Sequence, residues 1–252
     1  MKTIKYRTDG RLGILSLNRP EVLNTFNRKM LGEMLEVLDR LEGIDVLIVV
    51  GKGDKAFSYG ADVAEMSRMS AREVEAYSRL GHSLVVKLEE LPVVAIAAVD
   101  GFCVAGGLEI AMGCDLIYAS ERAHFALPEI KLGLIPGWGG DYRLSRAVGR
   151  RRARELMLFG RMFSAVEACE YGLVAEVFPE ESLMEECKKR ASELLEHSPF
   201  AAKHLKRSIH EVEGGETFTE KRFAECFITK EAQKRIKKYV QEKGDGNTSV
   251  HE

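Results

Sequence analysis

DGFCVAGGLEIAMGCDLIYAS, residues 100–120, is almost wholly small or apolar, yet a carboxylate, Glu109, lies in its middle, shortly after the pair Gly106-Gly107. Burying an ionised carboxylate costs free energy unless the group is paired or protonated. No basic residue lies between Asp100 and Ser120. The stretch therefore predicts a chemical role for Glu109. The alternative is that the glycines only permit close packing and that Glu109 favours a helix N-terminus.

The composition excludes several classes of protein. The chain has 252 residues, is 45% hydrophobic and carries a formal net charge of −2, which argues against a general nucleic-acid binder. No apolar run approaches the roughly 20 residues that span a bilayer, so no membrane association is expected. The five cysteines form no C-x-x-C motif, which predicts neither a disulfide framework nor a metal site and favours a reducing cytoplasm.

Alternating elements predict an α/β fold. A hairpin turning at Asp9-Gly10 precedes a helix over residues 28–42, for which Asn27 is the expected cap. Residues 45–51 and 92–101 are predicted as buried strands, with a helix over about 71–90 between them. From about residue 182 only amphipathic helical patterns follow. We therefore expect an α/β core over 1–195, a helical region over 196–252 and a frayed tail from residue 244.

Two glycine-containing turns offer free backbone N–H groups. A helix beginning near Gly106 would leave its first N–H groups without internal partners, at the positive end of the helix dipole. In KAFSYGADVAEM, residues 55–66, Gly60-Ala61 precedes a short helical pattern. Two such N–H groups that converge on one oxygen form an oxyanion hole. The alternative is an ordinary strand-to-helix loop.

A second unusual carboxylate lies in HFALPEIKLGLIPGWGG, residues 124–140. Pro128 biases its predecessor toward extended geometry, which predicts that Glu129 lies on an irregular segment after a short strand. Paired acids in a dry cleft can hold different protonation states and divide acid and base work. The alternative for Glu129 is a surface ion pair with Lys131 or a nearby arginine.

The sequence resembles the enoyl-CoA hydratase/isomerase (crotonase) family over most of its length, and is most like an enoyl-CoA hydratase. The resemblance is carried by LNRPEVLNTFNRKM, by KAFSYGADVAEM, by the stretch from residue 101 to 120, by FALPEIKLGLIPGWGGDYRL and by FITKEAQKRI, in that order along the chain. It implies a spiral of ββα units followed by a helical trimerisation region. It also implies a homotrimer or a dimer of trimers.

The resemblance further implies the site residues. The N–H groups of Ala61 and Gly106 would hold the thioester oxygen, and Glu109 and Glu129 would be the catalytic pair. The residues implied to bind coenzyme A or the acyl chain are Val22, Leu23, Thr25, Ala61, Asp62, Val63, Ala64 and Trp138. Trp138 and Tyr59 replace small residues of the family pattern, which suggests a short or unusual acyl chain.

The implied reaction is the reversible addition of water to a trans-2-enoyl-CoA, giving a 3-hydroxyacyl-CoA, within the metabolism of fatty acids and similar acyl groups. Coenzyme A belongs to the substrate, and no cofactor is expected. A Δ3-Δ2 enoyl-CoA isomerase is the nearest alternative, because one base near Glu129 could suffice for it. A noncatalytic relative that binds coenzyme A or RNA is a further alternative. The presence of both Glu109 and Glu129 favours the hydratase.

Overall fold

The computed structural model describes residues 1–212 and 219–244. Contacts divide the chain into Met1–Leu194 and Leu195–Glu252, one residue before the division expected from the sequence. The tail expected to fray lies, apart from Gly244, outside the described residues.

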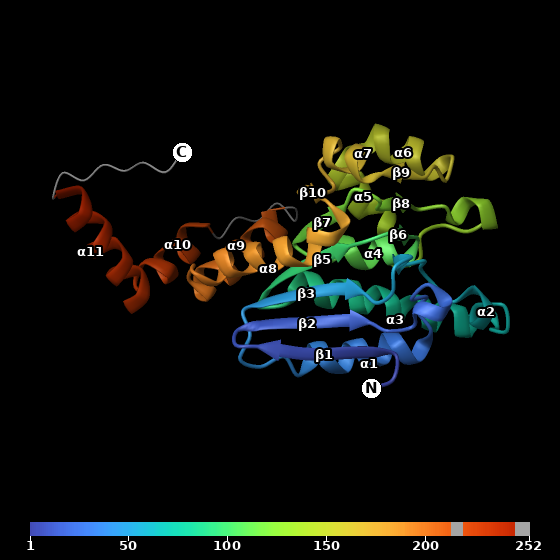
Figure 1. The fold of residues 1–252 in the computed structure, drawn as a ribbon, viewed down its shortest axis with the longest axis horizontal. Helices are drawn as coiled ribbons and strands as arrows, with labels where there is room; N and C mark the ends of the chain where they lie inside the picture. Colours follow the sequence, from blue (N-terminus) through green and yellow to red (C-terminus); the bar gives the residue numbers. More distant parts are fainter. Residues whose placement is uncertain (213–218, 245–252) are drawn as a thin grey trace. The chain divides into compact units, whose positions relative to one another are not determined.

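A six-stranded sheet forms the frame of the first unit (Figure 1). Its strand order is β1-β2-β3-β5-β7-β10, and only β1 and β2 run antiparallel. Its strands are β1 (Ile4–Asp9), β2 (Leu12–Leu17), β3 (Val46–Gly51), β5 (Val94–Val99), β7 (Leu116–Ser120) and β10 (Glu176–Phe178). The parallel strands β3 and β5 are the wholly apolar runs expected of strands covered on both faces.

A smaller four-stranded sheet consists of β4 (Ala56–Ser58), β6 (Phe102–Val104), β8 (His124–Ala126) and β9 (Phe163–Ser164), in that order. Along the chain, β3, β5 and β7 of the large sheet are followed by β4, β6 and β8 of the small one, and helices follow each pair. This repetition is the expected succession of ββα units, and the α/β class is confirmed. Strand β6 was not predicted as a strand separate from β5, because Gly101 turns the chain with a φ of +66° between two short apolar runs.

Helices pack against these sheets. The first unit contains α1 (Arg28–Asp39), α2 (Val63–Met66), α3 (Ala71–Glu90), α4 (Gly106–Met112), α5 (Gly140–Val148), α6 (Arg150–Leu158), α7 (Ala165–Glu170) and most of α8 (Leu183–Leu195). The unit also contains short 3₁₀ helices, namely η1 (Pro20–Val22), η2 (Glu129–Leu132) and η3 (Glu180–Ser182). Asn27 caps α1 as predicted, because its side chain accepts the N–H of Met30 at 2.9 Å. Ser70 and Glu73 form a capping box that fixes the start of α3.

One apolar face of each long helix closes the core. Helix α1 buries Met30, Leu31 and Met34, and α3 buries Leu84 and Leu88. These side chains belong to one cluster with the inward-facing residues of β3 and β5. The core therefore fixes the ends of β4 and β6. The loops with the two predicted N–H donors follow these two strands.

The hairpin differs from the prediction by one residue. Asp9 pairs with Leu12 in the β1–β2 ladder, so the connecting residues are Gly10 and Arg11 rather than Asp9 and Gly10. Gly10 has a φ of +55°, which glycine adopts without the steric cost that a Cβ would add.

In the described part of the second unit the chain is helical, with α9 (Pro199–Val212), α10 (Thr219–Phe227) and α11 (Lys230–Gly244). Several apolar side chains of this region are exposed, namely Phe200, Leu205, Ile209, Phe223, Phe227 and Ile228. The hydroxyl of Ser198 donates to Glu231 at 2.8 Å, and Arg235 donates to the carbonyl of Glu196 at 2.7 Å.

Candidate active site

The glycines of the opening stretch allow close approach. Helix α4 begins at Gly106, directly after Ala105, which has a φ of +53°. A Cβ at Gly106 would lie 2.4 Å from the ring of Trp138, and one at Gly107 would lie 2.4 Å from the carbonyl oxygen of Ser58. Packing therefore explains why both positions lack a side chain. The same packing holds the first N–H groups of α4 at a defined place.

The two predicted amide donors come from loops that touch. Gly60 has a φ of +89°, and a Cβ there would lie 2.9 Å from the nitrogen of Gly106 and 2.7 Å from Cβ of Ala105. Ala61 follows Gly60 directly. Among the described residues, neither the N–H of Ala61 nor that of Gly106 donates to a protein acceptor. Both N–H groups are therefore available to a ligand oxygen.

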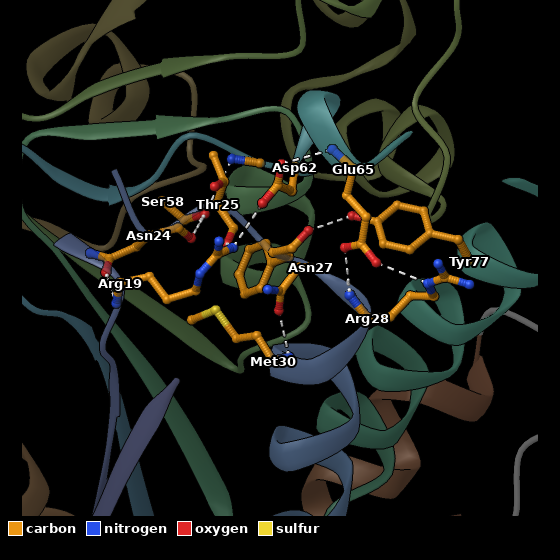
Figure 2. Close-up of polar contacts among 12 residues, drawn as sticks. Arg19, Asn24, Thr25, Asn27, Arg28, Met30, Ser58, Asp62, Glu65 and Tyr77 are labelled. Atoms are coloured by element: carbon orange, nitrogen blue, oxygen red, sulfur yellow. Dashed lines mark hydrogen bonds and ion pairs between the residues drawn. The ribbon is translucent and has the colours of Figure 1, made fainter. Parts of the chain in front are cut away.

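An ion pair joins the two segments expected to contact coenzyme A (Figure 2). Nη1 of Arg19 lies 3.0 Å from the carboxylate of Asp62 and donates to the carbonyl of Thr25 at 2.6 Å. Asp62 also caps α2, since its side chain accepts the N–H of Glu65 at 3.1 Å. The 19–25 segment and the start of α2 are thus tied together beside Ala61.

A buried polar network supports the same loop. The side chain of Asn24 donates to the carbonyls of Lys52 and Ala56 at 2.8 and 2.9 Å. The hydroxyl of Ser58 donates to the carbonyl of Asn24 at 2.8 Å and accepts the N–H of Gly60 at 3.1 Å (Figure 2). Because buried polar groups are costly when unpaired, this network holds Gly60 in its left-handed conformation.

Glu109 is buried, with 2% of its surface exposed. Its Oε1 accepts two backbone N–H groups, from Trp138 at 2.7 Å and from Gly140 at 2.8 Å. Burial raises the pKa of Glu109 to about 7, the two N–H donors oppose that rise, and the nearby charge of Glu129 adds to it. No hydrogen bond reaches Oε2 from a described residue. That oxygen is therefore available to a substrate or a water molecule.

Glu129 is the first residue of η2, two residues after the end of β8 and directly after Pro128, on the irregular segment that was predicted. Burial raises its pKa to about 7. Its Oε2 is buried without a hydrogen-bond partner in the described structure. The alternative of a surface ion pair with Lys131 or a nearby arginine is wrong, since Glu129 forms no ion pair with a described residue. The charge of Glu129 contributes to the raised pKa of Glu109, so the two carboxyls lie near each other.

The remaining predicted binding residues differ in exposure. Val22, Val63 and Ala64 are exposed, whereas Leu23, Thr25 and Asp62 are half-buried.

Trp138, also predicted to bind substrate, is 3% exposed. Its ring packs edge-on against Phe26 and Tyr77, with centroids 5.6 and 5.9 Å away, and against Gly106. Trp138 thus reaches the site through its backbone N–H and by lying against the start of α4.

The groups that hold Glu109 were not predicted from the sequence. The N–H donors of Trp138 and Gly140 lie about thirty residues further along the chain, and Arg143 contacts the same loop. A Cβ at Gly140 would lie 2.8 Å from Cγ of Glu109, so the glycine pair in PGWGG was the available signal. Nothing in its spacing identified the partner.

In the part of the chain that the structure describes, no group of three or more His, Cys, Asp or Glu side chains is arranged to hold a metal ion. No described helix is both long and apolar enough to cross a bilayer. Carboxyls with raised pKa suit proton transfer, and N–H groups without a protein acceptor suit the stabilisation of a developing oxyanion.

Comparison with known proteins identifies the family. The family profile described as enoyl-CoA hydratase/isomerase matches residues 8–246. A short-chain-enoyl-CoA hydratase of Clostridium acetobutylicum is 35% identical over 243 residues, covering 93% of each chain. A crotonyl-CoA hydratase of Syntrophomonas wolfei is 33% identical over 92% of this chain and 93% of its own.

Solved structures give the same result. The enoyl-CoA hydratase of Bacillus anthracis superposes with a TM-score of 0.91 at 30% identity, covering 95% of this chain and 96% of that one. An enoyl-CoA hydratase subunit of Geobacillus kaustophilus gives a TM-score of 0.89 at 34% identity, over 95% of each chain. The expected fold class and family are confirmed, and the chain belongs to the enoyl-CoA hydratase/isomerase family.

Proposed function

We propose that the protein is an enoyl-CoA hydratase that adds water reversibly to a trans-2-enoyl-CoA, with Glu109 and Glu129 as its catalytic pair. The observation that carries the proposal is the burial of two carboxyls near each other, each with its pKa raised to about 7, in a fold whose touching 60–61 and 105–106 loops carry N–H groups without a protein acceptor. The relatives named as enoyl-CoA and crotonyl-CoA hydratases support the same reaction.

The thioester oxygen would accept the N–H groups of Ala61 and Gly106. Attack of water at C3 drives negative charge onto that oxygen, and donors already in place stabilise the charge where it develops. The contact between Gly60 and the start of α4 supports this role, since it brings the two loops together.

The two carboxyls would divide the proton transfers. Glu109 receives two N–H donors, which favour its ionised form, whereas Oε2 of Glu129 has no donor. Ionised Glu109 therefore takes a proton from the attacking water, whose oxygen bonds to C3. Protonated Glu129 delivers its proton to C2 as the enolate collapses. The net change is one H and one OH added across the double bond, and solvent exchange restores both carboxyls.

The substrate's coenzyme A portion would run along the loops that Arg19 and Asp62 join. Val22, Leu23 and Thr25 would line it on one side. Asp62, Val63 and Ala64 would line it on the other, in addition to Ala61. The exposure of Val22, Val63 and Ala64 supports this path, because they are open to a ligand. Trp138, packed against Gly106, would limit the depth available to the acyl chain. No cofactor beyond coenzyme A of the substrate is proposed.

Crotonyl-CoA tests the reaction. Loss of the ultraviolet absorbance of the conjugated enoyl thioester, with 3-hydroxybutyryl-CoA as the product identified by chromatography, is the expected result. The isomerase alternative predicts that 3-butenoyl-CoA gains this absorbance while crotonyl-CoA is not hydrated. A noncatalytic relative would change neither compound.

The assembly is proposed to be a homotrimer or a dimer of trimers in the cytoplasm. Exposed Phe200, Leu205 and Phe223 in the described helical region support burial against other copies. The five cysteines are free, as a reducing compartment requires. Sedimentation equilibrium tests the assembly: a mass of three or six chains is expected, and a monomer would contradict it.

A further inference from the structure

A buried ion pair lies behind the loop that holds Glu109. Arg143 of α5 is 5% exposed, and its guanidinium donates twice to Glu89 of α3, at 2.7 and 2.5 Å. A bidentate pair of this kind fixes both the position and the plane of the guanidinium. The pair thus anchors Arg143 to the end of the longest helix in the unit.

The same guanidinium binds the loop. Nη1 of Arg143 donates to the carbonyls of Trp138 at 2.9 Å and Gly139 at 3.3 Å. The carbonyl of Gly139 and the N–H of Gly140 belong to one peptide group, and that N–H donates to Glu109. Since the oxygen and hydrogen of a trans peptide point in opposite directions, holding the oxygen aims the hydrogen.

Ser78 orients the N–H of Trp138, the second donor to Glu109, in the same way. The N–H of Trp138 shares its peptide group with the carbonyl of Gly137, and the hydroxyl of Ser78 donates to that carbonyl at 2.7 Å. Ser78 lies on α3, as Glu89 does. Gly139 has a φ of +88° and lies in a run of glycines, so the loop could otherwise turn its peptide groups readily.

We propose that Ser78 and the Arg143–Glu89 pair are positioning residues that orient the two peptide groups whose N–H donors hold Oε1 of Glu109. In the proposed mechanism, neither Ser78 nor the Arg143–Glu89 pair contacts the substrate. They act by fixing the direction in which Glu109 presents Oε2, and this role rests on the proposed function of Glu109 as the base.

The charged groups around Glu109 come from three elements. Glu129 faces it from η2, and Arg143 from α5. Glu89 neutralises Arg143 from α3, and His82 of the same helix lies beside Gly139. The small-sheet strands that pack on α4 present Ser58 and apolar side chains. The pKa of Glu109 therefore depends on the charges of Glu129, Arg143, Glu89 and His82, and a change of its pKa in a variant is compared with the effects of these four groups.

Two mild variants test the proposal. Arg143→Lys keeps the charge but cannot hold Glu89 and two carbonyls together. Ser78→Ala removes one hydroxyl from a half-buried position. We expect both to lower kcat on crotonyl-CoA with KM within about twofold, Arg143→Lys by about 10- to 100-fold, because a small misplacement of a reacting group has effects of this size. Arg122→Lys is the matched control: Arg122 forms a two-contact pair with Asp100 and donates to neither Glu109 nor the 137–140 loop, so kcat of this variant should not change.

A double-mutant comparison separates positioning from folding. In a Glu109→Ala background there is no carboxylate to orient, so Arg143→Lys should leave the residual rate unchanged. An equal loss in both backgrounds would overturn the proposal.

Titration of Glu109 gives a readout that needs no turnover. The carboxyl band in infrared difference spectra, assigned by its loss in Glu109→Gln, should move its midpoint to higher pH by about one unit in Arg143→Lys or Ser78→Ala, because weaker donors favour the neutral acid. An unchanged midpoint in both variants would overturn the proposal. Failure of wild-type protein to hydrate crotonyl-CoA would instead remove the proposed function, and the titration would still decide whether these residues orient Glu109.

Discussion

The N–H of Gly140 donates to Oε1 of Glu109 at 2.8 Å, and the two residues lie so close that a Cβ at position 140 would be 2.8 Å from Cγ of Glu109. The first residue of α5 thus serves as both a donor and a wall for this carboxylate. The position of Glu109 therefore depends on a contact between segments distant in sequence.

Replacing Gly140 with alanine should displace Glu109. We expect kcat on crotonyl-CoA to fall by about 10- to 100-fold, since the added methyl group overlaps the side chain that must be aligned. Gly32→Ala in α1 is the control, because a Cβ there meets nothing within 4 Å. That variant should keep full activity and gain stability by up to about 1 kcal/mol. Equal activity of the two variants would contradict the geometry.

Removing either carboxyl should remove most of the rate. Glu109→Gln and Glu129→Gln are each expected to lower kcat by about 10²- to 10⁴-fold, the usual contribution of general acid–base catalysis. Glu42→Gln, at an exposed position, should not differ from wild type. Wild-type turnover by Glu109→Gln would exclude that residue as the base, and the same result for Glu129→Gln would exclude the two-acid scheme.

The pH dependence of kcat should be bell-shaped with an optimum near pH 7. Burial raises the pKa of both Glu109 and Glu129 to about 7. At lower pH both carboxyls are protonated and no base remains; at higher pH both are ionised and no acid remains. Initial rates over a buffer series check this. A rate that is constant from about pH 5 to 9 would be incompatible with the assignment.

Gly60→Ala should damage the oxyanion site. A methyl group there would lie 2.9 Å from the nitrogen of Gly106 and would force the two loops apart. We expect kcat to fall by about 100-fold, comparable to the loss of one oxyanion donor.

Gly43→Ala separates this effect from backbone strain. Gly43 also has a positive φ, of +70°, but a Cβ there meets nothing within 4 Å. The free energy of unfolding of Gly43→Ala should be about 1 kcal/mol lower than that of wild type, whereas its kcat should be unchanged. Equal kcat values for the two variants would show that Gly60 does not space the donors.

The raised pKa of Glu129 also predicts a stability effect. Its folded pKa of about 7 exceeds the ordinary value of 4.5, so the fold favours the neutral acid. The stability that this neutral form contributes is present below the unfolded pKa and is lost as pH rises toward 7. Glu129→Gln should therefore resemble wild type near pH 4.5 and exceed it near pH 8 by on the order of 1–3 kcal/mol. Urea unfolding at the two pH values measures this, and a pH-independent difference would count against it.

Local sequence patterns were sufficient to predict much of the α/β framework. The helix over 71–90, the cap at Asn27 and the buried strands were predictable, because each depends on residues close together in sequence. The isolated carboxylates Glu109 and Glu129 could also be singled out, since a charge in an apolar run is unfavourable wherever the run is buried.

The support of the site was not predictable in this way. In the sequence, nothing distinguishes Glu89 and Arg143 from other charged helix residues. Their ion pair joins positions more than fifty residues apart. Ser78 contacts Gly137 across a similar separation. Such contacts depend on how α3, α5 and the glycine-rich loop pack, which no local spacing encodes.

A crystal structure of Glu109→Gln with crotonyl-CoA bound would show whether the two amides and the two acidic positions form one site. We expect the thioester oxygen to lie about 2.7–3.1 Å from the nitrogens of both Ala61 and Gly106. We also expect residues 109 and 129 to face the C2–C3 bond. A thioester oxygen away from these amides, or a double bond remote from either side chain, would contradict the proposed mechanism.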